Sequence, residues 1–280
     1  TATEKMTYSN DSHSRIPGAN MNREQSFAST TGNSEFGVGI GGERADSYPS
    51  DYNYESRIQK ITYSTETFAN VTQTLNNARR WSTALTEQTK GAYVVSGSVV
   101  GSGPSNSTWW SPGNVSFVEK YTFATDSVAR LPEASYFRYS GDYPEWGGRG
   151  AAMGAGTKSD GYFAGGAGSS DPGIPSGSRH TTIDRLSYST STWSQLGTFL
   201  SGGKYQAFSM QNTTDAYFCA GYGNPGDGNA TTTEKLTFAT DSCARVPGTD
   251  WPWMNGAGFG PIVTAGARQN SAYGSVPNVI

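Results

Sequence analysis

Hydrophobic and polar positions alternate with period two in several short stretches of the chain, and these stretches belong to one repeated phrase. Its two best-matched copies are EKYTFATDSVARLP (119–132) and EKLTFATDSCARVP (234–247). In each copy, apolar or aromatic residues alternate with Lys or Arg and with Thr or Ser, which predicts a strand with one buried face. A polar four-residue turn and a second strand follow. Each phrase therefore predicts a β-hairpin.

The phrase occurs five times without gaps. The other copies are EKMTYSNDSHSRIP (4–17), the looser QKITYSTETFANV (59–71) and DRLSYSTSTWSQL (184–196). In every copy the closing aliphatic residue follows the basic residue by eleven positions, and the basic residues are Lys5, Lys60, Lys120, Arg185 and Lys235. Successive basic residues are 55, 60, 65 and 50 positions apart. A repeat of roughly 50 residues is typical of a propeller or another repeat array.

A second hairpin is predicted between successive phrases, with its strands joined by short polar turns. Its second strand ends in glycine, as in EFGVGIGG (35–42), GAYVVSG (91–97), GYFAGGAG (161–168) and AYFCAGYG (216–223). Two hairpins give four antiparallel strands per repeat, which is one propeller blade. We therefore expect an all-β protein whose 280 residues form a single domain, a five-bladed β-propeller.

The two ends of the chain are expected to close this ring. The sequence begins in a third strand and stops after a second strand, so each end predicts half a blade. Leaving the halves apart would expose two sheet edges, which pairing N-terminal strands three and four with C-terminal strands one and two would avoid. The expected blades are approximately 17–74, 75–131, 147–197, 198–247, and 254–280 joined with 1–16.

The glycine pair that ends the second strand, with an aromatic residue inside that strand, makes each repeat resemble a kelch repeat. The match is loose in the second blade, where YVVSGS (93–98) stands in place of the pattern YFxGG. The more specific combination of EKxTFATDSxARxP with GYFxGG is similar to the kelch-like repeats in proteins encoded by tailed phages of marine cyanobacteria. This resemblance covers nearly the whole chain and implies a virion or extracellular location.

Composition and charge narrow the classes of partner. Charged residues make up 15% of the chain, aromatic residues 12%, and glycine contributes 36 residues, which is typical of an all-β protein with many turns rather than a disordered chain. The net charge of −3 gives no electrostatic case for binding nucleic acid or an anionic membrane surface. No apolar run approaches the roughly 18 residues of a membrane span. We expect neither a nucleic-acid partner nor membrane insertion.

Variation in length is concentrated in loops that we expect on one face of the ring, including 43–57, 98–116, 132–148 and 247–256. Aromatic side chains gather in these loops. Tyr and Trp offer a large contact area at low entropic cost, which favours a binding surface. The predicted surface consists of Tyr48, Tyr52, Tyr54, Trp109, Trp110, Tyr139, Tyr143, Trp146, Trp251 and Trp253. The alternative, which the sequence leaves open, is that these rings pack back onto the blades as small loop cores.

Motifs for catalysis are weak. The glycine-rich GYGNPG (221–226) leaves a predicted strand without the helix that a phosphate site needs. The predicted inner strands carry almost no carboxylates of the kind a glycosidase uses, and His13 and His180 are the only histidines. We expect no catalytic residue, no metal and no cofactor. Cys219 and Cys243 are expected on non-adjacent strands about 10 Å apart, too far for a disulfide.

The expected function is that of a non-enzymatic structural or adhesion propeller, such as a component of a phage tail. Its partners would be other virion or assembly proteins or a cell-surface glycan, in an oligomer or a multi-copy assembly. A soluble carbohydrate-binding lectin propeller is the alternative. Lectins of that kind usually repeat their binding residues from blade to blade, whereas the loops of this chain differ from one another. A glycan-active enzyme ranks third.

Overall fold

The computed structural model describes residues 4–7, 12–17, 28–43, 54–87, 90–99, 115–134, 149–168, 178–223, 231–249 and 262–263. Within these ranges the chain consists almost entirely of strands and turns. The helical element found there is the short 3-10 turn η2 (Pro132–Ala134). In the described part of the chain, no helix is long and apolar enough to cross a membrane.

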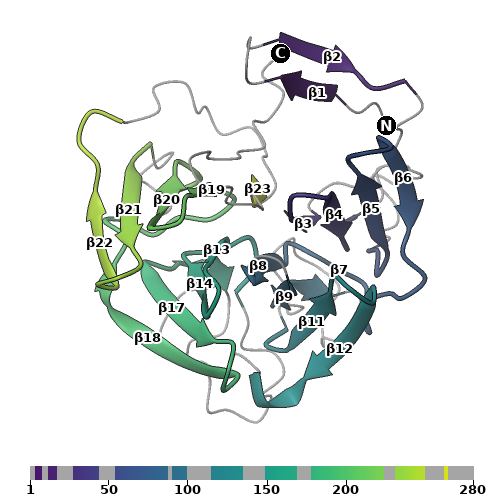
Figure 1. Ribbon diagram of the computed structural model, residues 1–280. Coiled ribbons are helices and arrows are strands. Elements are labelled where there is room, and N and C mark those ends of the chain that lie inside the picture. The colour runs from purple at the N-terminus through teal and green to yellow at the C-terminus, as the bar shows by residue number, and fades with distance from the viewer. Residues whose placement is uncertain are drawn as a thin grey trace, which may run out of the picture.

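Four antiparallel sheets form the blades of a propeller-like ring (Figure 1). Blade 1 consists of β3 (Ser29–Gly32), β4 (Phe36–Ile40), β5 (Ile58–Thr62) and β6 (Thr67–Asn70). Blade 2 consists of β8 (Thr83–Glu87), β9 (Gly91–Val95), β11 (Val118–Thr122) and β12 (Ser127–Leu131). Blade 3 consists of β13 (Met153–Gly156), β14 (Asp160–Ala164), β17 (Thr182–Ser187) and β18 (Thr192–Phe199). Blade 4 consists of β19 (Phe208–Gln211), β20 (Asp215–Cys219), β21 (Thr233–Thr237) and β22 (Ser242–Arg245).

The strands of each blade follow the chain order from the centre of the ring outward (Figure 1). The first strands β3, β8, β13 and β19 lie innermost, and neighbouring first strands contact each other. The second-to-third loops and the fourth-to-first connections therefore leave the blades at one end, which we call the loop face. The short turns leave at the opposite end, the turn face. The prediction of a propeller built from four-stranded blades is confirmed for these four blades.

Seven further strands do not belong to the four-stranded blades: four form the short loop-face pairs described below, and the other three are β1, β2 and β23. β1 (Glu4–Thr7) and β2 (Ser12–Arg15) form a separate antiparallel hairpin at the periphery of the ring (Figure 1). β23 (Ile262–Val263) lies within a predicted first strand, and it pairs in parallel with β19 and also contacts β3. The second strand expected near the C-terminal end of the half-blade 254–280 lies outside the described residues.

All five repeated phrases fold into antiparallel hairpins, as their alternation predicts. They share one register, in which the basic residue lies opposite the small residue nine positions later. The pairs are Lys5↔Ser14, Lys60↔Ala69, Lys120↔Ala129, Arg185↔Ser194 and Lys235↔Ala244. A slip by one residue would turn the buried face of the strand toward water. The phrase therefore specifies the register of the outer half of each blade.

The polar turn inside the phrase has a conserved geometry in the four blades. Its third residue adopts a left-handed backbone with φ between 51° and 55°, and these residues are Glu66, Asp126, Ser191 and Asp241. Hydroxyl groups on either side of that residue form a 2.7 Å hydrogen bond in each turn: Thr65–Thr67, Thr125–Ser127, Thr190–Thr192 and Thr240–Ser242. Short polar side chains of this kind stabilise turns by local hydrogen bonding. The ATDS signature is thus turn chemistry.

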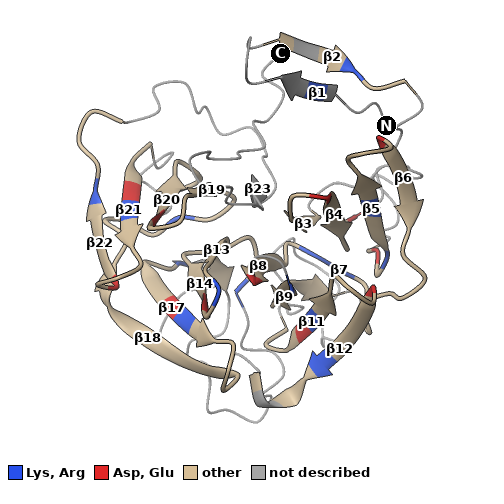
Figure 2. Ribbon diagram, in the orientation of Figure 1, with Lys and Arg blue, Asp and Glu red and all other residues tan. Residues whose placement is uncertain are grey.

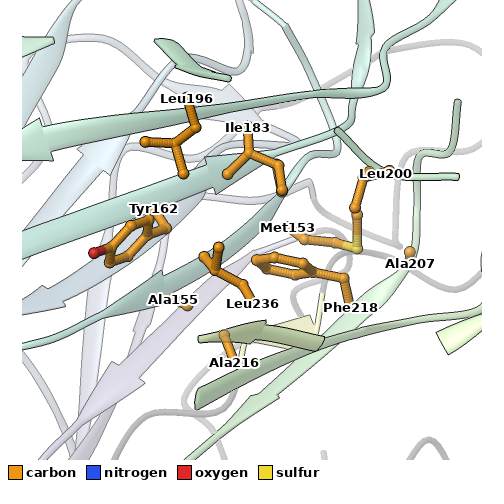
Figure 3. Close-up of a cluster of buried hydrophobic side chains, with 11 residues drawn as sticks. Met153, Ala155, Tyr162, Ile183, Leu196, Leu200, Ala207, Ala216, Phe218 and Leu236 are labelled. Atoms are coloured by element: carbon orange, nitrogen blue, oxygen red, sulfur yellow. The ribbon is translucent and has the colours of Figure 1, made fainter. Parts of the chain in front are cut away.

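Buried apolar side chains fill the space between neighbouring blades. Between blades 3 and 4, Tyr162, Ile183 and Leu196 meet Phe218 and Leu236 in one cluster (Figure 3). Similar clusters join blade 1 to blade 2 and blade 2 to blade 3. Burying a Leu or Phe side chain contributes about 1.5–3 kcal/mol. The core of this protein therefore lies between the blades, and each blade needs a neighbour to bury its faces.

Buried ion pairs hold the third strand to the segment that precedes the first strand. The acidic residue beside the phrase's basic residue is visible on β17 and β21 in Figure 2. It pairs with a base four positions before the first strand, and the buried pairs are Arg79–Glu119, Arg149–Asp184 and Lys204–Glu234. Burial lowers the pKa of Arg79, an effect that Glu119 opposes. Removing one partner would leave an unpaired buried charge, at a cost of about 3–5 kcal/mol. The repeated acid therefore has a structural role in blades 2, 3 and 4.

The basic residue of the phrase joins its blade to the next one on the turn face. Lys60 of blade 1 pairs with Asp126 of blade 2 at 2.5 Å. Arg185 of blade 3 pairs with Asp241 of blade 4, also at 2.5 Å. The acceptor is in both cases the left-handed residue of the neighbouring turn. The repeated phrase thus supplies the basic residue of one blade and the acidic residue of the next blade that form this ion pair.

The same contact varies at two other junctions. Lys5 of β1 pairs with Glu66 of blade 1 at 2.6 Å, which repeats the relation between blades 1 and 2. Blade 3 has Ser191 at the acceptor position, and Lys120 of blade 2 binds Glu87 at 2.8 Å instead. The ion pair between the N-terminal hairpin and blade 1 is therefore of the same kind as the pair between blades 1 and 2.

The two cysteines lie in blade 4 as free thiols, as predicted. Cys219 belongs to β20 and Cys243 to β22, with β21 between them. Burial raises the pKa of Cys219 to about 11 and that of Cys243 to about 12. Both thiols are protonated at neutral pH, so neither is an activated nucleophile.

Candidate binding face

The predicted binding surface overlaps the described residues at one position. Tyr54 is half-buried and forms a backbone bridge with Glu43 on the loop face. The other predicted residues lie outside the described residues: Tyr48, Tyr52, Trp109, Trp110, Tyr139, Tyr143, Trp146, Trp251 and Trp253. Whether those nine rings form a binding surface or loop cores stays a prediction.

On the loop face, short backbone pairings extend the blades beyond their main strands. They join residues just before a first strand to residues just after the second strand, or residues at the two ends of a second-to-third loop. The strand pairs are β7 (Arg79–Arg80) with β10 (Ser98–Val99), and β15 (Ala167–Gly168) with β16 (Ser178–Arg179). Single bridges are Glu43↔Tyr54, Gly150↔Ala167 and Tyr205↔Tyr222. These pairings fix the backbone of the loop face.

The glycine pair after the second strand makes these pairings possible, but its two positions differ. The second position has a φ of 92–111° in all four blades and is always glycine: Gly42, Gly97, Gly166 and Gly221. The first position has a φ of 53–65°, and Ser96 and Ala220 occupy it in blades 2 and 4. Non-glycine residues can adopt the first conformation but rarely the second. This explains why the loose YVVSGS copy still forms a blade.

A chain of backbone hydrogen bonds links blades 2, 3 and 4 at the inner rim of the loop face. The amide of Ala151 donates to the carbonyl of Trp81 at 2.8 Å, and the amide of Gln206 donates to the carbonyl of Ala151 at 2.9 Å. Each of these residues lies two positions before its first strand and has a φ of 48–56°. A bulky side chain such as Trp81 is uncommon in that conformation. Because the equivalent residues of three blades share this left-handed backbone conformation, we infer that the fold imposes the conformation.

Arg80 lies against two aromatic rings from two blades. Its guanidinium carbon is 4.0 Å from the ring centroid of Trp81 and 4.9 Å from that of Tyr54. The Nη1 group donates to the carboxylate of the buried Glu43. A cation over an aromatic face contributes about 0.5–2 kcal/mol. Arg80 therefore fixes Tyr54 of blade 1 beside Trp81 of blade 2.

A second arginine–aromatic contact lies between blades 3 and 4. The guanidinium carbon of Arg179 is 4.9 Å from the ring centroid of Tyr205. The rings of Tyr205 and Tyr222 are 5.3 Å apart and tilted by 33°. One hydrophobic cluster connects these rings to Trp81 and contains Ala151, Ala167, Tyr205, Trp81 and Tyr222. We call Tyr54, Arg80, Trp81, Arg179, Tyr205 and Tyr222 the loop-face cluster.

Of these six residues, only Tyr54 was predicted from the sequence, because it lies in a long loop. Trp81 and Tyr205 lie in connections of ordinary length, and Tyr222 follows directly after a strand glycine. An alignment of the residues two and three positions before each first strand would have found part of the cluster. Those residue pairs are Arg80–Trp81, Gly150–Ala151 and Tyr205–Gln206.

Strongly shifted pKa values occur on the turn face, between blades. Burial raises the pKa of Tyr121, and its hydrogen bond to Asp126 raises it further. Burial also raises the pKa of Tyr162, with a further contribution from the charge of Asp241. Tyr188 has a raised pKa because it is buried. These phenols are protonated at neutral pH. Tyr121 and Tyr162 therefore act as hydrogen-bond donors and Tyr188 as a packing group, and none of the three acts as a base.

In the loop-face cluster, Arg80 and Tyr205 are buried and hold the partly exposed aromatic rings of Tyr54, Trp81 and Tyr222 in place. Metal chemistry has no comparable basis in the described ranges, where no group of three or more His, Cys, Asp and Glu side chains could hold an ion. Aromatic and arginine side chains are the residues most often responsible for affinity in protein interfaces. The loop face is therefore the candidate binding face.

Comparison with known proteins supports the fold and leaves function open. No protein-family model matches the chain, and no curated protein matches it. Among solved structures, the structure of YjhT aligns with a TM-score of 0.64 at 13% sequence identity, covering 88% of this chain and 75% of that chain. At this identity the likeness shows a shared arrangement of strands and nothing of activity.

Proposed function

We propose that this chain is a non-enzymatic structural or adhesion propeller whose loop face contacts a host-surface glycan or a neighbouring structural protein. The observation that carries the proposal is the loop-face cluster, in which Arg80 lies against Tyr54 and Trp81. Arg80 is buried and holds the two partly exposed rings rigidly, and rigid aromatic side chains at one face suit a recognition surface. Since the contacts come from neighbouring blades, the ring itself orients these side chains.

The proposed setting is a phage tail or another virion-associated assembly, with a virion or extracellular location. The support is the repeated phrase, which resembles the kelch-like repeats in proteins of tailed phages of marine cyanobacteria. Its partners would be other virion proteins or a cell-surface glycan. In such an assembly the chain would occur in several copies.

The same proposal gives the ring five blades, with β1 and β2 as the outer half of the fifth and residues 254–280 as its inner half. The pair Lys5–Glu66 supports this, because it repeats the contact that joins blade 1 to blade 2 and blade 3 to blade 4. β23 adds support from the other end of the chain, since it pairs with β19 of blade 4 and contacts β3 of blade 1. A fifth first strand would lie between those two.

A lectin propeller is the second candidate function. A lectin of this kind would repeat its sugar-binding residues from blade to blade. Equivalent positions of the loop face hold instead Arg80, Gly150 and Tyr205, three residues of different chemistry. This difference favours one asymmetric site per chain. Titration with a bound sugar would therefore give one site per chain for the adhesion function and several for a lectin.

Replacing Tyr54 and Trp81 together with Ala tests the recognition surface. We expect the double variant to bind intact marine cyanobacterial cells at least about tenfold more weakly than the parent, because a central aromatic residue contributes about 2 kcal/mol to an interface. The control is Tyr63→Ala, which removes a 46%-exposed ring on the turn face. Binding of fluorescently labelled protein to the cells measures both variants.

The control should attach like the parent. Near-ultraviolet circular dichroism establishes that both variants remain folded. If the folded double variant attaches as strongly as the parent, or if the control loses as much binding as the double variant, the loop face is not the recognition surface.

A further inference from the structure

We propose that the face of blade 4 that bears Tyr217 and Lys235 is a docking site for the N-terminal hairpin of the same chain, with Asp11 as the acceptor that both side chains share. The inference rests on the proposed five-bladed ring and adds a named contact on the turn face. It comes from comparing the junctions between blades, where a tyrosine, a base and a carboxylate recur together.

The junction of blades 3 and 4 shows this arrangement in full. The carboxylate of Asp241 accepts a hydrogen bond from the hydroxyl of Tyr162 at 3.0 Å and another from Arg185 at 2.5 Å. Tyr162 and Arg185 lie opposite each other in blade 3, whereas Asp241 belongs to the polar turn of blade 4. Hydrogen bonds to a carboxylate are stronger than those between neutral groups. One acid of blade 4 thus binds two side chains of blade 3.

Each junction has one tyrosine, which comes from either of two positions. One position is the second-strand residue opposite the base, and the other follows the base in the phrase of the next blade. At the three junctions between the four blades these two residues share a buried cluster: Val38 with Tyr121, Tyr93 with Leu186, and Tyr162 with Leu236. The sequence continues the series with Tyr217 and Met6, and with Tyr273 and Ile61. The residue types therefore fit the N-terminal phrase beside blade 4.

Blade 2 shows what replaces the acid when the next blade lacks it. Blade 3 has Ser191 at the acceptor position. Lys120 instead donates to Glu87, in the first strand of its own blade, at 2.8 Å and to the hydroxyl of Tyr93 at 3.0 Å. By register, the equivalent of Glu87 in blade 4 is Asn212, whose side-chain oxygen accepts hydrogen bonds from amides of its own turn. Blade 4 therefore lacks this substitute.

The base of blade 4 has only a longer contact within its own blade. Lys235 lies 3.4 Å from Asp215, and the Lys235 side chain is 42% exposed. Blade 3 has an acid, Asp160, at the position of Asp215, yet Arg185 pairs with Asp241 of the next blade. An acid at this position is therefore not the preferred partner of the base.

Tyr217 lies on a face of blade 4 that is incompletely covered. Its equivalents Val38, Tyr93 and Tyr162 are buried, whereas Tyr217 is partly exposed. In the described part of the chain, Tyr217 packs on a cluster whose members all come from blade 4: Phe208, Met210, Cys219 and Ala220. The clusters at the other three junctions contain residues of two blades. An apolar face of this kind is stabilised by a neighbour that removes it from water.

The N-terminal hairpin has the features of that neighbour. β1 and β2 share the register of the other phrase hairpins, and Asp11 follows Lys5 by six positions, as Asp241 follows Lys235. Lys5 pairs with Glu66 of blade 1, and the hairpin lies on the side of the ring between blades 1 and 4 (Figure 1). Since the base of the hairpin serves blade 1, its acid would serve blade 4. This position favours the hairpin of the same chain over that of a second copy.

The experiment links cysteines with a short bismaleimide in a variant without native cysteines, made by Cys219→Ser and Cys243→Ser. The test protein adds Asp11→Cys and Lys235→Cys. We expect nearly all molecules to be linked within one chain, because the two side chains would meet at one junction. Peptide mapping identifies the linked positions, and a denaturing gel separates linkage within a chain from linkage between chains.

Two matched pairs calibrate the linkage. Arg185→Cys with Asp241→Cys reproduces the contact between blades 3 and 4 and should link as completely as the test pair. Arg185→Cys with Asp11→Cys places the base in the wrong blade and should stay unlinked. No linkage of the test pair, or equal linkage of the misplaced pair, would overturn the docking site. Linkage between chains would overturn the assignment to the same chain.

Charge reversal tests the same contact without a crosslinker. Lys235→Glu should lower the melting temperature by about 2 °C, as loss of a partly exposed ion pair predicts, and adding Asp11→Lys should restore it. Glu35→Lys reverses an exposed acid on the turn face of blade 1 and should not restore it. No restoration by Asp11→Lys, or equal restoration by Glu35→Lys, would contradict the contact. Cell attachment of the Tyr54 and Trp81 variant, on the loop face, decides the recognition function separately.

Discussion

At the residue scale, the blades depend on one backbone position that only glycine fills. In all four blades, the second residue after the end of the second strand has a φ of 92–111°. In blade 4, a Cβ at Gly221 would lie 2.6 Å from the Cβ of Ala207 and 2.8 Å from the carbonyl oxygen of Tyr205. Conformation and crowding act in the same direction there. The glycine at this position is therefore required by backbone geometry rather than by ligand binding.

Gly221→Ala tests this requirement. We expect it to lower the free energy of unfolding by about 1–3 kcal/mol, because alanine would be strained at that φ and its methyl group would meet the backbone of the preceding connection. Gly202→Ala is the control, since nothing lies within 4 Å of a Cβ at that position. The control should change the free energy of unfolding by less than about 0.5 kcal/mol. Urea titration measures both variants, and equal effects would contradict the geometric explanation.

At the element scale, the hairpins could be predicted because their signals are local. Alternation, the polar turn and the small residue that faces the basic residue all lie within fourteen positions of the chain. The contacts between blades could not be predicted in the same way. Lys60 and Asp126 are 66 residues apart, and each phrase contains both a base and an acid that could have paired within one hairpin. The choice of the neighbouring blade follows from the curvature of the ring, which no single phrase encodes.

The loop-face cluster was missed for a related reason. Trp81 adopts a left-handed backbone that tryptophan rarely takes, and a hydrogen bond from Ala151 of the next blade accompanies it. Arg179 and Tyr205 meet across a junction between blades. Composition and loop length describe neither relation. What could be predicted was that the loops of this face carry aromatic residues, of which Tyr54 lies within the described part of the chain.

Deleting residues 1–16 tests the role of the N-terminal hairpin as an element of the ring. We expect the truncated protein to aggregate or to lose cooperative thermal unfolding, because a blade without its outer strands exposes a sheet edge. The control Lys5→Gln keeps the hairpin and removes its ion pair with Glu66. Both side chains of that pair are well exposed, at 55% and 37%, so the pair contributes at most about 1 kcal/mol. Calorimetry measures thermal unfolding. If the truncated protein unfolds like the parent, the N-terminal hairpin is not an element of the ring.

At the scale of the whole molecule, the central claim is that the two ends of the chain complete one blade and close the ring. Blades bury their faces against each other, so an open arc would leave two apolar faces without a neighbour. Closure would also set the register between the two ends of the chain. In the four blades the basic residue of the third strand lies opposite Val38, Tyr93, Tyr162 and Tyr217 of the second strand. Tyr273 is the equivalent of Tyr217 in the repeat, so closure predicts that it faces Lys5.

The geometry of this predicted pair suits a disulfide. The amide of Gly41 donates to the carbonyl of Arg57, and the pairs alternate along the ladder, so Lys60 and Val38 form a pair without mutual hydrogen bonds. Opposite residues of that kind have Cα atoms about 4.5 Å apart, within the range that a disulfide spans. Lys5 and Tyr273 would form the same kind of pair.

The most direct test replaces Lys5 and Tyr273 with Cys. The background is a variant without native cysteines, made by Cys219→Ser and Cys243→Ser. After mild oxidation, we expect peptide mapping without reductant to find the two positions linked in nearly all molecules. The control pairs Met6→Cys with Tyr273→Cys, which lie one register step apart and on opposite faces of the sheet, and it should stay unlinked. Free thiols at both positions in the oxidised test protein, or equal linkage in the control, would contradict the closed five-bladed ring.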